Sequence, residues 1–155
     1  MITSIIFSKD RALQLDLTLK TIRKNFDLCD DVIVIYKTSE RQYKESYENL
    51  KEEHSSVSFY EQSHSLFVDI LATISGATSD YVCFFTDDNI VYRKVPINNL
   101  QLNHVFNSGA SCLSLRIGVN TTQRDYGDGT LRNDNIPGEV FSDPPFIVWN
   151  RTSIP

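Results

Sequence analysis

Val32-Ile33-Val34-Ile35-Tyr36 is an unbroken apolar run rich in β-branched side chains. A strand that alternates apolar and polar residues has one face in water, whereas a continuous run indicates a strand covered on both faces. Such strands lie in parallel sheets that carry helices on both sides. The run therefore predicts a central strand of an α/β protein.

A strand and a helix are predicted before this run. Residues 3–8 (Thr-Ser-Ile-Ile-Phe-Ser) form a short apolar stretch closed by a polar residue, which predicts a buried strand. From Asp10 onward, apolar residues recur every three or four positions, which predicts an amphipathic helix with Asp10 as its N-cap. The apolar stripe consists of Leu15, Leu19, Ile22 and Phe26, widened by Leu13 and Leu17.

The alternation of strands and helices continues after the central run. Residues 40–53 are highly charged and carry Tyr43, Tyr47 and Leu50 at helical spacing, which predicts a surface helix held by a thin apolar stripe. The further predicted elements are a strand at 57–60, a helix from 66 that ends near 76, and a buried strand at 81–85. This order predicts a three-layer α/β/α, Rossmann-like fold with a mostly parallel sheet.

The pattern is less regular after residue 90. The predicted elements there are a helix at 98–107, a strand at 111–117, a loop-rich stretch at 120–138 and a last strand at 146–149. A chain of 155 residues can bury one sizeable core, and no repeat or linker divides it. We therefore expect a single domain, 1–155, with halves at 1–90 and 91–155.

Composition and charge exclude several classes of protein. Fifteen Lys and Arg against 20 Asp and Glu give a net charge of −5, so no basic field favours a nucleic-acid partner. No apolar run approaches the roughly 20 residues of a transmembrane segment, and charges at residues 9–11 interrupt any secretory signal. We expect a cytoplasmic protein, and a location at the inner surface of the membrane is compatible with this expectation.

The cysteines and histidines point to no metal site. Cys29, Cys83 and Cys112 are odd in number and widely spaced, which fits neither a disulfide framework nor paired zinc ligands. We expect Cys83 and Cys112 to be inert core thiols. The histidines are expected at the surface or on a helix stripe (His54 and His104) and in a turn or cap (His64).

Two polar clusters, residues 8–11 and 86–89, directly follow predicted strands. Ligands of parallel sheets bind beyond the carboxyl ends of the strands. Adjacent carboxylates flanked by neutral oxygen ligands suit Mg²⁺ or Mn²⁺, and a turn with Arg11 and free N–H groups suits phosphate. The alternatives are a solvated turn in which Asp87 or Asn89 caps a following segment, and a plain helix start with Asp10 as its cap.

Three stretches together resemble bacterial glycosyltransferases of the GT-A fold: IIFSKDRALQL at 5–15, YVCFFTDDNI at 81–90 and SLRIGVN at 114–120. That family transfers a sugar from a nucleotide-diphosphate donor, whose diphosphate is bridged by a divalent cation on an aspartate motif. The resemblance implies this metal role for Asp87 and Asp88, with Mn²⁺ or Mg²⁺ as cofactor. It also implies a UDP- or GDP-sugar donor, a glycan or other hydroxyl acceptor, and a role in surface polysaccharide synthesis.

The resemblance also implies which residues contact the donor. These are Phe7, Ser8, Asp10, Arg11, Tyr36, Thr38, Asp69, Thr86 and Asp87. The family motif is usually Asp-x-Asp, so either Thr86 with Asp88 or Asp87 with Asn89 replaces the usual pair, and we favour Asp88 as the direct ligand. The general base is unassigned among the acidic residues of the tail, namely Asp125, Asp128, Asp134, Glu139 and Asp143.

Other hypotheses stay open beside the transferase. The chain is short for such an enzyme, so a catalytically incomplete, C-terminally truncated nucleotide-sugar-binding module of the same fold is the main alternative. A nucleotidyltransferase ranks last, because residues 8–13 contain no glycine for a Gly-rich phosphate loop. Arg116, within an apolar predicted strand, needs a partner, for which a carboxylate of the tail is the structural explanation.

Overall fold

A computed structural model of the chain describes residues 2–107, 109 and 113, and the backbone of four short strands between 124 and 148. The chain divides into two compact units, Met1–Val95 and Pro96–Pro155, close to the predicted division at residue 90. That the two units form one domain stays a prediction. Within the described residues, no helix has both the length and the apolar character needed to cross a membrane.

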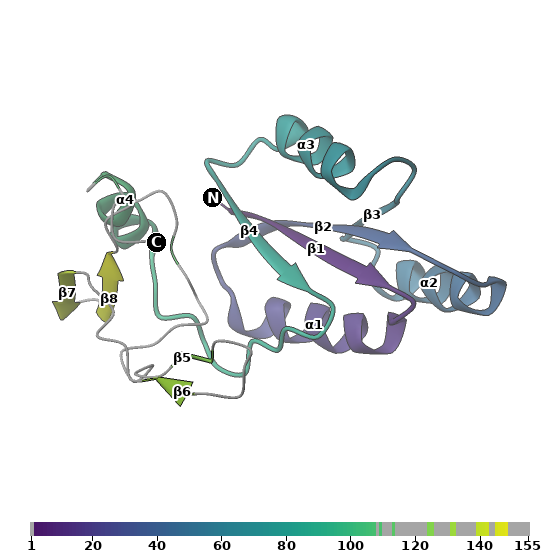
Figure 1. The fold of residues 1–155 in the computed structure, drawn as a ribbon, viewed down its shortest axis with the longest axis horizontal. Coiled ribbons are helices and arrows are strands. Elements are labelled where there is room, and N and C mark those ends of the chain that lie inside the picture. The colour runs from purple at the N-terminus through teal and green to yellow at the C-terminus, as the bar shows by residue number, and fades with distance from the viewer. Residues whose placement is uncertain are drawn as a thin grey trace. The chain divides into compact units, whose positions relative to one another are not determined.

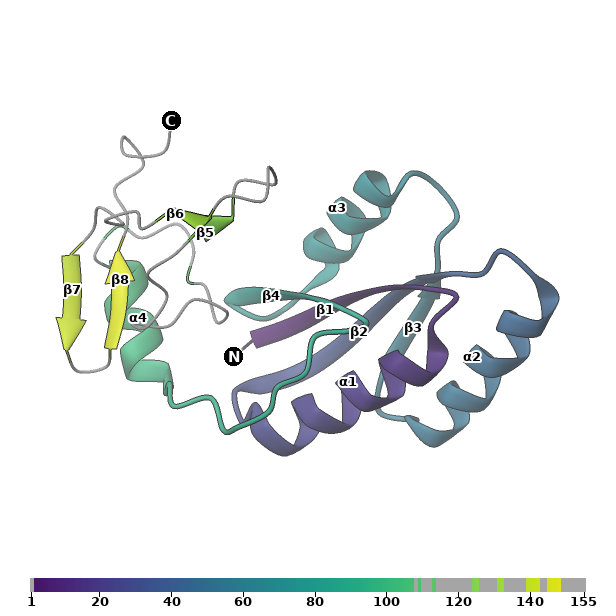
Figure 2. The same cartoon turned by 60° about the horizontal axis from the view of Figure 1, so that its bottom comes forward.

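The first unit is a parallel four-stranded sheet with helices on both faces. Its strands are β1 (Ile2–Lys9), β2 (Cys29–Lys37), β3 (Ser58–Glu61) and β4 (Tyr81–Thr86), in the order β3-β2-β1-β4. Its helices are α1 (Ala12–Asn25), α2 (Arg41–Glu53) and α3 (Leu66–Gly76). Helices α1 and α2 cover one face and α3 the other (Figures 1 and 2), which confirms the predicted three-layer fold and the interior position of β2.

Helix α1 buries the stripe that its sequence predicts, but the stripe is narrower than expected. Leu15, Leu19 and Ile22 are buried, whereas Leu13 and Leu17 are 80% and 52% exposed. Two positions along a helix turn the side chain by about 200°, so residues 13 and 17 lie opposite the buried face. The prediction that they widen the stripe is wrong.

Asp10 does not cap α1 as predicted. The N-cap residue is Arg11, and no side chain caps the helix there. Asp10 has a φ of 58°, a left-handed conformation that Asp tolerates better than most residues. Its carboxylate accepts hydrogen bonds from the backbone N–H and the hydroxyl group of Ser39 at 2.7 and 2.8 Å. The carboxylate therefore joins the turn after β1 to the loop after β2.

Helices α2 and α3 differ in how they pack. Tyr47 and Leu50 of α2 are buried, as the predicted stripe requires, whereas no residue of α3 is buried. Strand β4 was predicted to be a buried strand, yet within the described residues it pairs with β1 alone, at the end of the strand order. Phe85 is its buried side chain and Phe84 is 51% exposed, so an apolar run of this length does not predict that every side chain in it is buried.

The second unit contains helix α4 (Asn99–Asn107) and two hairpins. Asn98 and Gln101 exchange side-chain to backbone hydrogen bonds of 2.9 and 3.0 Å, a capping box that starts α4. The antiparallel pairs are β5 (Arg124–Asp125) with β6 (Leu131–Arg132), and β7 (Glu139–Ser142) with β8 (Pro145–Val148). Strand β8 matches the predicted last strand.

Of two other predictions for this unit, one differs from the structure and one lies outside the described residues. Strands β5 and β6 lie in the stretch expected to be loop, because two residues are too few for a periodic pattern. The predicted strand at 111–117, with Cys112 and Arg116, lies outside the described residues apart from residue 113.

Candidate functional site

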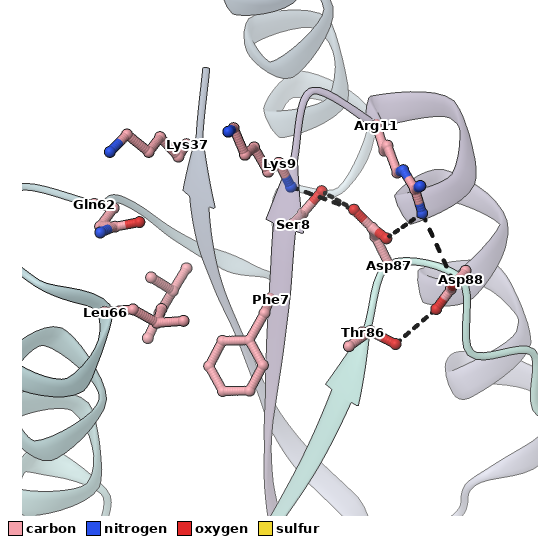
Figure 3. Close-up of a pocket in the computed structure, with 11 residues that line it drawn as sticks. Phe7, Ser8, Lys9, Arg11, Lys37, Gln62, Leu66, Thr86, Asp87 and Asp88 are labelled. Atoms are coloured by element: carbon pink, nitrogen blue, oxygen red, sulfur yellow. Dashed lines mark hydrogen bonds and ion pairs between the residues drawn. The ribbon is translucent and has the colours of Figure 1, made fainter. Parts of the chain in front are cut away.

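The two predicted polar clusters meet in a pocket of about 340 Å³ at the carboxyl ends of β1, β2 and β4 (Figure 3). Parallel pairing aligns Phe7 with Thr86 and Lys9 with Lys37. The residues that line the pocket are Phe7, Ser8, Lys9, Arg11, Ile35, Lys37, Gln62, Leu66, Thr86, Asp87 and Asp88. The topology therefore brings together residues nearly 80 positions apart, as ligand sites of parallel sheets require.

Asp87 is buried and held from several sides. Its Oδ2 accepts hydrogen bonds from the Ser8 hydroxyl group at 2.9 Å and from the Lys9 backbone at 3.3 Å. Its Oδ1 lies 3.6 Å from Nη1 of Arg11. Its carbonyl oxygen accepts a hydrogen bond from the hydroxyl group of Thr18, on α1, at 2.8 Å. Asp87 thus fastens the end of β4 to β1 and α1.

Asp88 has a different setting. Its side chain is 59% exposed, its Oδ2 lies 3.7 Å from Nη1 of Arg11, and its Oδ1 accepts a 2.6 Å hydrogen bond from Thr86. Asn89 closes the turn, because its Oδ1 accepts from the Thr86 N–H at 2.9 Å. A turn is therefore present, but Asn89 caps the end of β4 and not a following segment as the alternative interpretation expected. The turn presents the Asp88 carboxylate to solvent.

These residues fit a hard divalent cation with Asp88 as its protein ligand. Mg²⁺ is commonly bound by one or two carboxylates together with substrate phosphates and water, and an exposed carboxylate beside a hydroxyl group meets that need. Asp87 is 6% exposed with both oxygens on residues 8–11, whereas the side chain of Asp88 is 59% exposed and open to water and ligand. The geometry thus separates the two acids into one that can take a cation and one that holds the strand ends.

Three cationic side chains line the same pocket. Lys9 and Lys37 end neighbouring strands, and the guanidinium group of Arg11 lies against both acids (Figure 3). Within the part of the chain that the structure describes, neither lysine forms an ion pair with a carboxylate.

Sequence reasoning did not select several residues that the structure places near this site. Lys37 and Gln62 line the pocket, and Tyr47 lies behind it, within hydrogen-bond distance of Ser8. Lys37 could have been predicted from strand register, because it ends β2, the strand that pairs with β1. No local pattern marks Gln62 or the hydroxyl group of Tyr47.

Four predicted donor contacts do not line this pocket. Tyr36 is 2% exposed and stacks on Tyr47 in the core, with ring centroids 4.5 Å apart. The carboxylate of Asp10 accepts hydrogen bonds from Ser39. Thr38 lines neither this pocket nor the second pocket described next. Asp69 lines a second pocket of about 320 Å³ between β2, β3 and α3, where backbone N–H groups of the loop before α3 hold its carboxylate.

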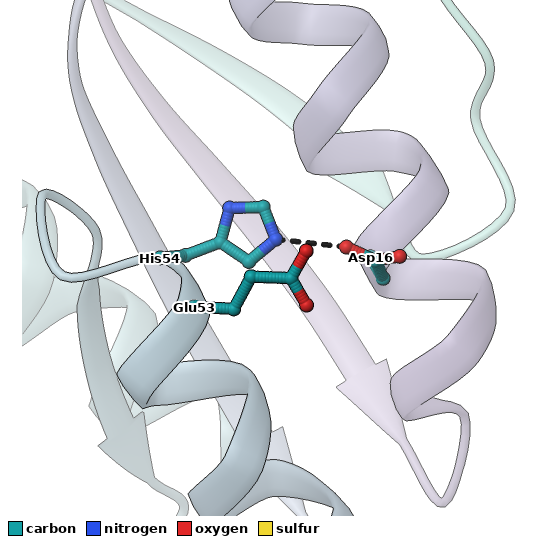
Figure 4. A group of neighbouring side chains, drawn as sticks. All are labelled: Asp16, Glu53 and His54. Carbon is teal, nitrogen blue, oxygen red and sulfur yellow. Dashed lines mark hydrogen bonds and ion pairs between the residues drawn. The ribbon is translucent and has the colours of Figure 1, made fainter.

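Another group of polar side chains joins α1 to α2 (Figure 4). Asp16, Glu53 and His54 bring their ligand atoms within 4.8 Å of one another, and His54 lies 2.8 Å from Asp16. His54 was expected at the surface or on a helix stripe, but it is buried, because it follows the last turn of α2 and faces α1. The ammonium group of Lys20 lies 2.8 Å from both carboxylates, so the group already contains its own cation.

The pKa of Asp16 reflects these neighbours. Burial raises the pKa of its carboxyl group, but hydrogen bonds from Lys20 and His54 and the charge of Lys20 lower it by more. The net pKa lies below the ordinary value of 3.8. The Asp16 group therefore stabilises the contact between α1 and α2 in its ionised form.

The described cysteines carry protonated thiols. Burial raises the pKa of Cys83 to about 12 and also raises that of Cys29. A thiol that stays protonated is a poor nucleophile and a poor metal ligand, which agrees with the prediction that Cys83 is inert.

Comparisons with known proteins support the fold. No family model and no curated protein matches the chain. Its structure is similar to that of 4-diphosphocytidyl-2C-methyl-D-erythritol synthase from Anaerococcus prevotii DSM 20548, with a TM-score of 0.50 and 11% sequence identity. The match covers 99% of this chain and 65% of that one. The likeness establishes the α/β fold alone.

Proposed function

We propose that the protein is a transferase that binds a nucleoside-diphosphate substrate in the pocket at the ends of β1, β2 and β4. The observation that carries this proposal is that three cations, Lys9, Arg11 and Lys37, line the same pocket as the exposed carboxylate of Asp88, with Arg11 beside it. A diphosphate needs several positive groups, and a divalent cation on Asp88 adds one more.

The residues of the pocket have separate tasks in this proposal. Arg11 donates hydrogen bonds to phosphate oxygens from a guanidinium group that Asp87 and Asp88 orient. Lys9 and Lys37 bind the same anion as point charges, and Phe7 with Leu66 provides an apolar wall. When bound, the divalent cation supplies Lewis-acid stabilisation of the charge that develops on the leaving diphosphate.

A glycosyl group is the transferred group that we favour, with Mn²⁺ or Mg²⁺ as cofactor and a hydroxyl compound as acceptor. The aspartate motif after the apolar strand supports this choice. Nucleotidyl transfer is a second candidate, because the structural neighbour is named as the synthase of a diphosphocytidyl compound. A binding module without transfer activity is the third.

Calorimetric titration tests the binding step. UDP, GDP and CTP are titrated into the protein with and without Mn²⁺, and into Asp88→Asn. The control is Asp31→Asn, which removes an exposed carboxylate near the amino end of β2. Metal-dependent binding that Asp88→Asn abolishes and Asp31→Asn retains supports the proposal. Absence of binding by the folded wild type overturns it.

The nucleotide that binds then separates the candidate reactions. Incubation with the matching nucleotide-sugar, with water or an added hydroxyl compound as acceptor, is followed by mass spectrometry. Release of the nucleoside diphosphate together with the free or acceptor-bound sugar should reveal transfer of a glycosyl group. Release of inorganic pyrophosphate from a nucleoside triphosphate instead indicates nucleotidyl transfer. Binding without release of either product indicates the module without activity.

A further inference from the structure

Tyr47 connects helix α2 to the pocket from behind. Its side chain is fully buried and stacks on Tyr36. Its hydroxyl oxygen lies 2.5 Å from Oγ of Ser8 and 3.2 Å from the backbone nitrogen of Arg11. Helix α2, which lines no part of the pocket, therefore reaches two residues that do.

The direction of each hydrogen bond follows from the groups at the two ends. A backbone N–H can only donate, so Arg11 donates to the hydroxyl oxygen of Tyr47. An ionised carboxylate can only accept, so Ser8 donates to Asp87 and has no second proton to give. The Tyr47 hydroxyl group must then donate to Ser8. The chain runs in one direction, from Arg11 through Tyr47 and Ser8 to Asp87.

The chain closes on the residue where it begins. The guanidinium group of Arg11 lies 3.6 Å from Oδ1 of Asp87, whose Oδ2 is the last acceptor (Figure 3). The backbone and the side chain of Arg11 are thus tied to one carboxylate by two routes. A movement of Tyr47 would shift both the start of α1 and the acid that orients the guanidinium group.

We propose that Tyr47 is a positioning residue of the pocket: its hydroxyl group holds Ser8 and the backbone of Arg11 so that the Arg11 guanidinium group, oriented by Asp87, faces the phosphates of the ligand. This inference rests on the proposed function, because it takes that ligand to be a nucleoside diphosphate. Tyr47 touches no ligand in this account and acts through Ser8 and Arg11.

Removal of one oxygen atom isolates this role from packing. Tyr47→Phe keeps the ring and its stack on Tyr36, but leaves the Arg11 N–H and the Ser8 hydroxyl group without their shared partner. Tyr43→Phe is the matched control, since Tyr43 lies one turn earlier on α2 and does not line the pocket. A structural role alone would lower stability and leave the affinity of the folded protein unchanged.

The test combines calorimetry with amide NMR on the full chain. Tyr47→Phe should bind the nucleotide that wild type binds, with Mn²⁺, about tenfold more weakly, and the Arg11 amide signal should shift and exchange faster without ligand. Tyr43→Phe should match wild type in both. Ser8→Ala removes the acceptor that holds the Tyr47 hydroxyl group and so loosens its bond with the Arg11 N–H, which should shift the Arg11 amide signal in the same direction but by less. It replaces Tyr47→Phe should that variant unfold, with the amide signal as its readout because Ser8 itself lines the pocket.

The outcomes separate the two proposals. Wild-type binding with unchanged affinity in Tyr47→Phe overturns the role of Tyr47 and leaves the proposed function standing. No binding by wild type overturns the proposed function, and it also overturns the role of Tyr47 in that function. Weaker binding with an unchanged Arg11 amide signal also contradicts the inference, because the effect would then not pass through Arg11.

Discussion

The carboxylate of Asp10 accepts two hydrogen bonds from Ser39, one from the backbone N–H and one from the hydroxyl group. These bonds join the turn after β1 to the loop after β2, and β1 and β2 end in Lys9 and Lys37 of the pocket. The segments that follow the two lysines are therefore tied together by a contact outside the pocket.

Substitution of Asp10 should separate its two contributions. Asp10→Ala and Asp10→Gly both lose the bonds to Ser39, but only alanine is strained at a φ of 58°. We expect both variants to melt below wild type, with the alanine variant lower than the glycine variant. Thermal unfolding followed by circular dichroism measures the order, and an alanine variant at or above glycine would contradict the strained turn.

Acidification should weaken the contact between α1 and α2. The pKa of Asp16 is below 3.8 in the folded protein, so its stabilisation is present above the unfolded-state pKa and is lost as pH falls through the folded-state pKa. The melting temperature of wild type should fall more steeply than that of Asp16→Asn below a pH of about 4. Parallel curves for the two proteins would show that the Asp16 carboxylate is not stabilised by its partners.

Salt should weaken the ion pairs that Lys20 forms with Asp16 and Glu53. Lys20→Met removes a cation that bonds two carboxylates, whereas Lys44→Met removes one that lies 3.9 Å from a single exposed carboxylate. Lys20→Met should destabilise the protein more than Lys44→Met, and about 0.5 M NaCl should narrow the difference because salt screens partly exposed charges. Urea unfolding at two salt concentrations measures this. Equal effects of both substitutions would contradict the cluster.

Thr18→Val should loosen the end of β4. The Thr18 hydroxyl group is buried and donates to the carbonyl oxygen of Asp87, so an isosteric valine leaves that oxygen without this donor. We expect a loss of about 1–2 kcal/mol in the free energy of unfolding. The control is Thr73→Val, because the Thr73 hydroxyl group donates to the carbonyl oxygen of Asp69 within α3 itself. Urea unfolding compares the two, and an effect no larger than that of the control would contradict the tether.

The sequence predicted the order of the elements in the first unit because each element has a local pattern. The unbroken run of β2 and the spacing of Leu15, Leu19 and Ile22 report burial directly. The exposure of Phe84 and the absence of buried residues on α3 have no such pattern, since they depend on which neighbours cover an apolar surface. The local apolar patterns therefore predicted more buried side chains on β4 and α3 than the structure shows.

The site was predicted in part for a related reason. Residues 8–11 and 86–89 follow strands, and the rule for parallel sheets places them together without knowledge of tertiary structure. The separate settings of Asp87 and Asp88 depend on Ser8, Thr18 and Arg11, which lie far away in sequence. The contribution of Tyr47 was equally hidden, because a tyrosine on a helix stripe resembles any other core residue.

Paramagnetic NMR with Mn²⁺ tests the central claim most directly. With nucleotide present, Mn²⁺ at Asp88 should broaden the amide signals of residues 8–11 and 86–89 first, because paramagnetic broadening falls steeply with distance, and Asp88→Asn should abolish this selectivity. Broadening centred on Asp16, Glu53 and His54, or signals unaffected by Mn²⁺ and nucleotide together, would contradict a cation and phosphate site at the carboxyl ends of β1 and β4.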